Sequence, residues 1–235
     1  MALQLSLLTG SPLLGKQPSP ADLDLALELN LSHCQAEAQR VGPAENGADL
    51  YWRMAFAILS VHSNFHATCG AWQELRGLGD EVDPHYPVTV IPILRRWNRI
   101  QYPVQKGKFL SLLWDAMFRD GECFWPQGLE DVEYRDYVRK GVKGLAWAKS
   151  SFATMLVKGE ADVACVDTHM YRLFTGSPAR GQIKGPEYLE LESRVRVLAQ
   201  RHGVSTSVTQ HSLWDAMRGV HSPLLPDEGT ACSSA

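Results

Sequence analysis

Apolar side chains recur along this chain at intervals of three and four residues, the spacing of one face of an α-helix. Leu23, Leu27 and Leu31 form the first such stripe. The pattern predicts helices over residues 20–39, 50–75, 89–97, 106–118, 132–140, 147–157, 167–174, 186–202 and 208–220. The alternation of apolar and polar residues that is typical of β-strands is nearly absent from the sequence. The sequence therefore predicts an all-α fold.

Breaks in this pattern suggest the limits of the folded part. Residues 1–20 hold three prolines and two glycines and are expected to be loosely ordered, and residues 223–235 are expected to form a frayed tail. The string LWDAM occurs at 113–117 and again at 213–217, but the flanking residues share little. Two helices that each carry a similar tryptophan-bearing face explain this repeated string better than a repeat array does.

Composition excludes several classes. Hydrophobic residues make up 45% and charged residues 21%, which is ordinary for a globular protein. No run of 18 apolar residues predicts a membrane span, and the first residues lack the basic start of a secretory signal. Five scattered cysteines without a CxxC pair favour a reducing compartment. We do not expect a secreted protein. We expect one that is cytoplasmic or associated with the nucleoid, or nuclear if it comes from a eukaryote.

Charge gives a mixed indication about nucleic acid. The net charge of -3 and the sequence pI of about 6.2 argue against unspecific binding to phosphates. Residues 95–150, however, hold 11 Lys and Arg against 7 Asp and Glu. This local excess of four fits either a solvated helical surface or a face that neutralises a few phosphates.

The segment 141–174 carries the candidate chemistry. Gly144-Leu145-Ala146, next to Lys143, begins a helix whose first N–H groups are uncovered and could receive a phosphate, although many plain helical hairpins look the same. Asp167 opens the next helix and is expected to cap it. The same carboxylate is also placed to stabilise a developing cation at a sugar C1′ or to align a water.

These motifs resemble the helix-hairpin-helix DNA glycosylase superfamily, which includes endonuclease III, MutY and 8-oxoguanine glycosylase. Four matches carry the resemblance, in family order: residues 57–60 (AILS), 102–108 (YPVQKGK), 144–151 (the hairpin) and 166–169 (VDTH). The resemblance implies a two-lobed helical domain over residues 21–222 with a cleft between the lobes. It also implies a monomer that binds double-stranded DNA, flips one nucleotide and excises a damaged or modified base.

The resemblance assigns roles residue by residue. Asp167 would stabilise the transition state, and Gly144, Ala146, Lys143 and His169 would contact DNA. His62, with Asn64 as the alternative, would fill the gap left by the flipped base; a partly buried structural histidine is equally compatible. Among the tryptophans, Trp147 in the hairpin is the least explained by core packing. A monovalent cation on the hairpin carbonyls is compatible with the pattern.

The hairpin departs from the family pattern in two places. Ala146 stands where a second glycine is usual, and Ala148 stands where lyase-competent relatives carry a lysine, with Lys149 beside it. Neighbouring helical residues point about 100° apart. Lys149 is therefore either a Schiff-base nucleophile in an offset hairpin or a lysine that contacts phosphate or solvent. The pattern favours a monofunctional glycosylase.

Metal binding and other functions are less well supported. Only Cys232 follows Cys165, so no iron–sulfur cluster is expected. His62, His66 and Cys69 would share one helix face, but further zinc ligands are missing from the pattern, and we expect no metal. Two alternatives remain open: a phage-type transferase of the same fold acting on hydroxymethyl-pyrimidines in DNA, and a non-catalytic DNA-binding module.

Overall fold

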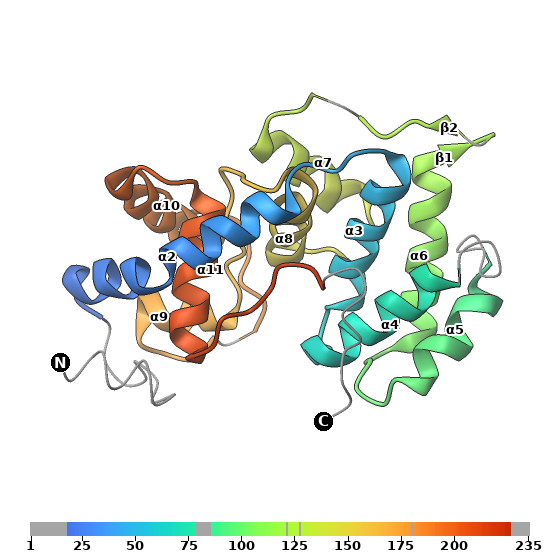
Figure 1. Cartoon of the computed structure of the whole chain (residues 1–235), viewed down its shortest axis with the longest axis horizontal. Coiled ribbons are helices and arrows are strands. Elements are labelled where there is room, and N and C mark those ends of the chain that lie inside the picture. The colour runs from blue at the N-terminus through green and yellow to red at the C-terminus, as the bar shows by residue number, and fades with distance from the viewer. Residues whose placement is uncertain (1–17, 79–85, 121, 127, 180, 227–235) are drawn as a thin grey trace. The chain divides into compact units, whose positions relative to one another are not determined.

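The computed structural model describes residues 18–78, 86–120, 122–126, 128–179 and 181–226 (Figure 1). Within these ranges the chain forms ten helices, α2 to α11, and one antiparallel pair of two-residue strands. The predicted all-α class is confirmed. Most of the N-terminal segment for which we expected loose order lies outside the described residues. No helix in the described ranges is long and apolar enough to cross a membrane.

The helices divide into two compact units. The first unit comprises residues 18–42 and the described residues of 158–224; the second comprises 43–157 together with the described residues after 224. The first unit holds α2 (Pro20–Val41), α9 (Thr168–Thr175), α10 (Gly185–His202) and α11 (Thr206–Arg218). The second unit holds α3 (Gly47–Leu59), α4 (Phe65–Gly77), α5 (Pro87–Arg96), α6 (Pro103–Met117), β1 (Phe118–Arg119), β2 (Glu122–Cys123), α7 (Asp131–Gly141) and α8 (Trp147–Lys158).

Helix α11 is the centre of the first unit. It packs against α2, α9 and α10, and nearly every residue from Thr206 to Leu213 is buried. Its contact with α2 includes Cys34, Ala38 and Val208, all of which are almost inaccessible to solvent. Helix α2 begins with a capping box, in which Ser19 and Asp22 each accept the other's backbone N–H. Of the predicted stripe, Leu27 is fully buried, Leu31 is partly buried against this contact, and Leu23 is half-buried.

Helix α3 has the corresponding position in the second unit. All of its residues from Met54 to Leu59 are buried, and it packs against α4 and α6. The buried Arg53 pairs with Asp49 at 2.8 Å and donates to the carbonyl of Leu156 at 2.7 Å. A buried guanidinium needs such partners, and the bond to Leu156 joins α3 to α8.

Two differences from the predicted elements bear on function. The single helical stretch expected over 50–75 is divided by a turn at 60–64, in which His62 has a φ of 53° and Asn64 caps α4. The expected break at 121–126 contains strand β2, which pairs with β1 just before the break. The chain also stays packed beyond residue 222, since buried Leu224 donates its N–H to Glu37.

Candidate active site

The hairpin between α7 and α8 has the tight turn that the sequence predicts. Gly144 has a φ of +91°, and a Cβ there would lie 2.5 Å from the ring of Phe109. Only glycine fits this conformation and this contact. Ala146 accepts the first helical hydrogen bond of α8, from the N–H of Ser150 at 2.8 Å. An alanine is therefore compatible with the turn, and Lys143 and Gly144 are exposed at its tip.

Trp147 connects the two helices of the hairpin. The guanidinium groups of Arg139 and Arg135, both on α7, lie 4.2 and 5.3 Å from the centre of its ring. Cation–π contacts of this kind stabilise a pair of helices, so they account for the tryptophan that the sequence left unexplained. Trp147 thus has a structural role within the hairpin.

Lys149 lies in the first turn of α8 and is half-buried. Its ammonium is 4.8 Å from the centre of the Phe152 ring. No carboxylate within the described ranges pairs with it, and its charge acts on another lysine, Lys106. Two neighbouring ammonium groups repel each other, and this repulsion acts on the pKa of Lys106.

Lys106 is a functional candidate that the sequence motif contained but did not explain. Its side chain is 3% exposed, and its ammonium donates to the carbonyls of Leu59 and Val61, each at 2.7 Å, and to the hydroxyl of Ser63 at 2.6 Å. Burial, and to a smaller extent the charge of Lys149, lowers the pKa of Lys106 to about 7. The three bonds hold the carboxyl end of α3 and the turn that follows it.

The turn held by Lys106 presents His62. This histidine is exposed, and its positive φ is uncommon for a residue with a side chain. The ring of Tyr102, which also has a positive φ and is exposed, lies 6.3 Å from it. Asn64 instead uses its side-chain oxygen to accept the N–H of Ala67 at the start of α4. His62 is therefore the freer of the two predicted residues to contact a ligand.

We expect Lys106→Met to destabilise this turn. Methionine has a similar length but cannot donate, so two carbonyls and a hydroxyl would lose their partner at a cost of about 1–3 kcal/mol in the free energy of unfolding. Chemical denaturation followed by circular dichroism measures this change. Lys108→Met, at the exposed neighbouring lysine, is the control and should leave the stability unchanged. Equal stabilities of the two variants would contradict the anchoring role of Lys106.

Asp167, in the first unit, caps α9 as the sequence predicts. Its Oδ1 accepts the N–H groups of His169 at 2.9 Å and Met170 at 3.0 Å. Its Oδ2 accepts the indole N–H of Trp214 at 3.1 Å, a contact between α9 and α11 that the sequence does not reveal. Three donors and the amino end of a helix surround this half-buried carboxylate, and each of them favours its negative charge.

The segment before Asp167 is rigidly held. Residues 163–166 are buried. The hydroxyl of Tyr188 donates to the carbonyl of Ala164 at 2.5 Å and accepts the N–H of Val166 at 3.3 Å. The N–H of Ala164 donates to Glu192 at 3.1 Å. Side chains of α10 thus satisfy the backbone of an irregular segment and fix the place of Asp167.

Comparisons with known proteins identify the fold. A curated protein of Fusobacterium nucleatum, named 8-oxoguanine DNA glycosylase/AP lyase, is 24% identical over 186 residues, which cover 75% of this chain and 84% of that protein. The crystal structure of the Thermotoga maritima 8-oxoguanine DNA glycosylase matches with a TM-score of 0.69 at 19% identity and covers 86% of this chain and 99% of that one. No family model matches the sequence.

A third comparison involves a structure with DNA. The Methanocaldococcus jannaschii 8-oxoguanine glycosylase/lyase, crystallised with a 15mer DNA containing 8-oxoguanine, has a TM-score of 0.68 at 14% identity and covers 85% of this chain and 99% of that one. The chain has a DNA glycosylase fold. The resemblance to the helix-hairpin-helix superfamily is confirmed. The expected monofunctional character is not supported, because the Fusobacterium and Methanocaldococcus proteins are both named as lyases.

The remaining predicted residues of this glycosylase fold are placed as follows. His169 is exposed at the start of α9 and contributes its backbone N–H to Asp167. His62 lies in the turn before α4, whereas His66 and the buried Cys69 lie within α4. These three residues therefore do not share one helix face, and within the described ranges they are not among the groups whose ligand atoms converge.

We expect Trp214→Phe to slow the reaction that depends on Asp167. Phenylalanine keeps an aromatic ring beneath Arg218, which lies 4.3 Å from the indole, but removes the donor to the carboxylate. A lost hydrogen bond to a charged group corresponds to roughly a tenfold lower single-turnover rate. Trp125→Phe is the control, because it also removes an indole donor, here to Tyr134 in the second unit. An unchanged rate in Trp214→Phe would exclude a role for this bond.

Proposed function

We propose that this protein is a DNA glycosylase that removes an oxidised purine of the 8-oxoguanine type from duplex DNA and then cleaves the abasic product. The fold and the distant sequence relative support the glycosylase activity. The names of the relatives point to 8-oxoguanine as the first substrate to test. The environment of Lys149 is the single observation that carries the second step.

Lys149 meets the requirements for a Schiff-base lysine. Such a residue must bring its nitrogen to the sugar carbon, and an ion pair with a nearby carboxylate would hold it away. Lys149 is half-buried over an aromatic ring, has Lys106 as its charged neighbour, and pairs with no carboxylate in the described ranges. A lysine that only contacted phosphate would be better placed at the exposed tip, where Lys143 lies.

In the proposed reaction the amine of Lys149 attacks C1′ of the flipped nucleotide. The bond between C1′ and the base breaks, and the base leaves with the electron pair and takes up a proton. Loss of the proton on the lysine nitrogen and opening of the sugar ring give an iminium ion, and loss of a C2′ proton then expels the 3′ phosphate. Water finally hydrolyses the iminium and releases Lys149.

Asp167 is proposed to stabilise the positive charge that develops on the sugar. Its carboxylate has a fixed direction because two backbone N–H groups and the Trp214 indole hold its oxygens. A preorganised charge is effective because it does not have to reorient during the reaction. The alternative is a purely structural role, in which Asp167 serves only as a helix cap. The substitution Asp167→Asn tests it.

DNA contact is proposed for residues of both units. The exposed turn of Lys143 and Gly144 and the half-buried Ala146 lie at the amino end of α8, which suits a phosphate. The exposed His62 is proposed to fill the space left by the flipped base. His169 is proposed to contact the backbone beside Asp167. The local basic excess over residues 95–150 belongs to the second unit and supports phosphate binding there.

The test uses duplexes that contain 8-oxoguanine, other damaged bases or hydroxymethyl-pyrimidines, with mass spectrometry of free bases and of the remaining DNA. Release of 8-oxoguanine together with strand cleavage is the expected result. An increase in the mass of the DNA without base release would favour the transferase alternative. Binding to DNA without any chemical change would favour the non-catalytic module.

A further inference from the structure

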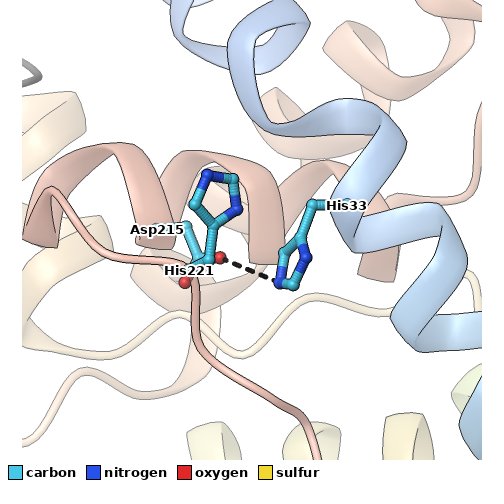
Figure 2. Close-up of side chains that lie close together, drawn as sticks. All are labelled: His33, Asp215 and His221. Atoms are coloured by element: carbon cyan, nitrogen blue, oxygen red, sulfur yellow. Dashed lines mark ion pairs between the residues drawn. The ribbon is translucent and has the colours of Figure 1, made fainter.

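A cluster of metal-ligating side chains surrounds Asp215 in the first unit (Figure 2). It joins residues of α2, of α11 and of the segment that follows α11. The members are His33, Cys34, His211, Asp215 and His221. None of them takes part in the proposed glycosylase chemistry, so the cluster needs a separate explanation.

The spacing of the cluster suits a single ion. One ligand atom each from His33, Asp215 and His221 lies within 4.8 Å of the others. Nitrogen and oxygen ligands about 2.0–2.2 Å from a tetrahedral zinc ion lie about 3.3–3.6 Å apart. The Nε2 of His33 is 3.9 Å from Oδ2 of Asp215, as the dashed line in Figure 2 shows. The ligand atoms would therefore have to move up to about 1.5 Å closer together to complete the site.

Two ring nitrogens in the cluster have no partner. Nε2 of His33 and Nδ1 of His211 are buried and make no hydrogen bond. Buried polar atoms are nearly always satisfied, so an orphan atom in a cluster of ligands indicates a missing ion or water. His33 can meet this requirement directly as a ligand, because its Nε2 faces the carboxylate.

The carboxylate of Asp215 is already oriented for such a role. Its residue is 1% exposed, and the N–H of Ser222 donates to both of its oxygens, at 3.2 and 3.1 Å. The thiol of Cys34 lies 3.8 Å from Oδ2, and Nε2 of His211 is bonded to the carbonyl of Ser222 at 2.8 Å. Metal-binding carboxylates typically depend on surrounding groups of this kind, and Cys34 and His211 would supply them.

The two histidines provide access from solvent. His221 is exposed, and one third of the side chain of His33 is exposed. Their rings lie 4.4 Å apart and nearly perpendicular to each other. An ion could therefore reach Asp215 without unfolding of the buried part of the cluster. Two imidazoles and one carboxylate form a ligand set that suits zinc and similar divalent transition metals.

We propose that His33, Asp215 and His221 form a binding site for a divalent transition-metal ion, and that the bound ion fastens α2 to the segment after α11. This inference replaces the sequence-based expectation of a metal-free protein, and it stands independently of the proposed glycosylase function. The alternative is a cluster of protonated histidines paired with Asp215, which would bind no metal.

The test is titration of EDTA-treated full-length protein with zinc chloride, followed by isothermal calorimetry and by elemental analysis after gel filtration. We expect one zinc ion per chain. His221→Ala alters an exposed residue, so the protein should fold, and its affinity for zinc should fall by at least about tenfold. His66→Ala, in the second unit, is the matched control and should bind zinc normally.

Thermal unfolding provides a second readout. Zinc should raise the melting temperature of the wild-type protein, because a ligand of the folded state stabilises that state, and it should not do so in His221→Ala. Failure to retain zinc, or equal affinities in the wild type, His33→Ala and His221→Ala, would overturn the proposal. Cys34→Ser should weaken zinc binding less than His33→Ala and His221→Ala do, and a larger loss in Cys34→Ser would overturn the assigned set of ligands.

Discussion

Lys149→Gln should abolish the covalent adduct that borohydride traps between the protein and DNA containing 8-oxoguanine. Glutamine fills a similar volume but has no nucleophilic amine, so no Schiff base can form. Loss of a covalent nucleophile should lower the single-turnover rate by on the order of 10³-fold or more. Denaturing gel electrophoresis after borohydride treatment measures the adduct, and quenched time courses measure the rate.

Lys143→Gln is the matched control for this prediction. It removes the same charge from the exposed tip of the same hairpin. The control should weaken DNA binding modestly and retain the adduct, because only one phosphate contact would be lost. An adduct that survives Lys149→Gln would exclude Lys149 as the nucleophile. Base release without any adduct in the wild type would restore the monofunctional mechanism with an activated water.

Asp167→Asn should lower the single-turnover rate by on the order of 10²–10³-fold while DNA binding is largely kept. The substitution removes the negative charge that we propose to stabilise the sugar cation. The amide oxygen can still cap α9, but the amide NH₂ would then face the indole N–H of Trp214, which is also a donor. We therefore expect a small loss of stability, on the order of 1 kcal/mol, besides the loss of rate.

A second carboxylate separates capping from catalysis. Asp22 in the capping box of α2 is half-buried, like Asp167, and lies in the first turn of its helix. Asp22→Asn should lower stability by a similar amount and leave the rate unchanged. A near-normal rate in Asp167→Asn, measured with saturating enzyme, would reduce Asp167 to a helix cap.

Much of the local structure followed from the order of the residues. The spacing of leucines predicted α2, and the Val166–His169 box predicted a helix capped by Asp167, because both depend on neighbours in sequence. The prediction of one helix over 50–75 was wrong, since the sequence pattern continues across the turn at His62. That turn is held by Lys106, more than 40 residues later in the sequence, whose ammonium donates hydrogen bonds to its carbonyls.

The candidate site depends more than the local structure does on contacts between residues that are far apart in the sequence. Spacing alone left Lys149 ambiguous, because a helix position says nothing about the burial and the charges around a side chain. The fold places Lys106 beside it and a phenyl ring beneath it. The sequence likewise gave no reason to connect Trp214 with Asp167, since the two residues belong to different helices.

By itself, the sequence determined the helical class, the hairpin glycine and the cap at Asp167. These features follow from backbone preferences and from periodicity within a few residues. Only the tertiary structure decided what surrounds Lys149 and which residues converge on Asp215. Cys34 and Asp215 lie 181 residues apart, and packing of α2 against α11 brings them together. The helices pack together because their apolar faces are buried, and this packing decides which polar residues meet. The spacing of those polar residues along the sequence does not show it.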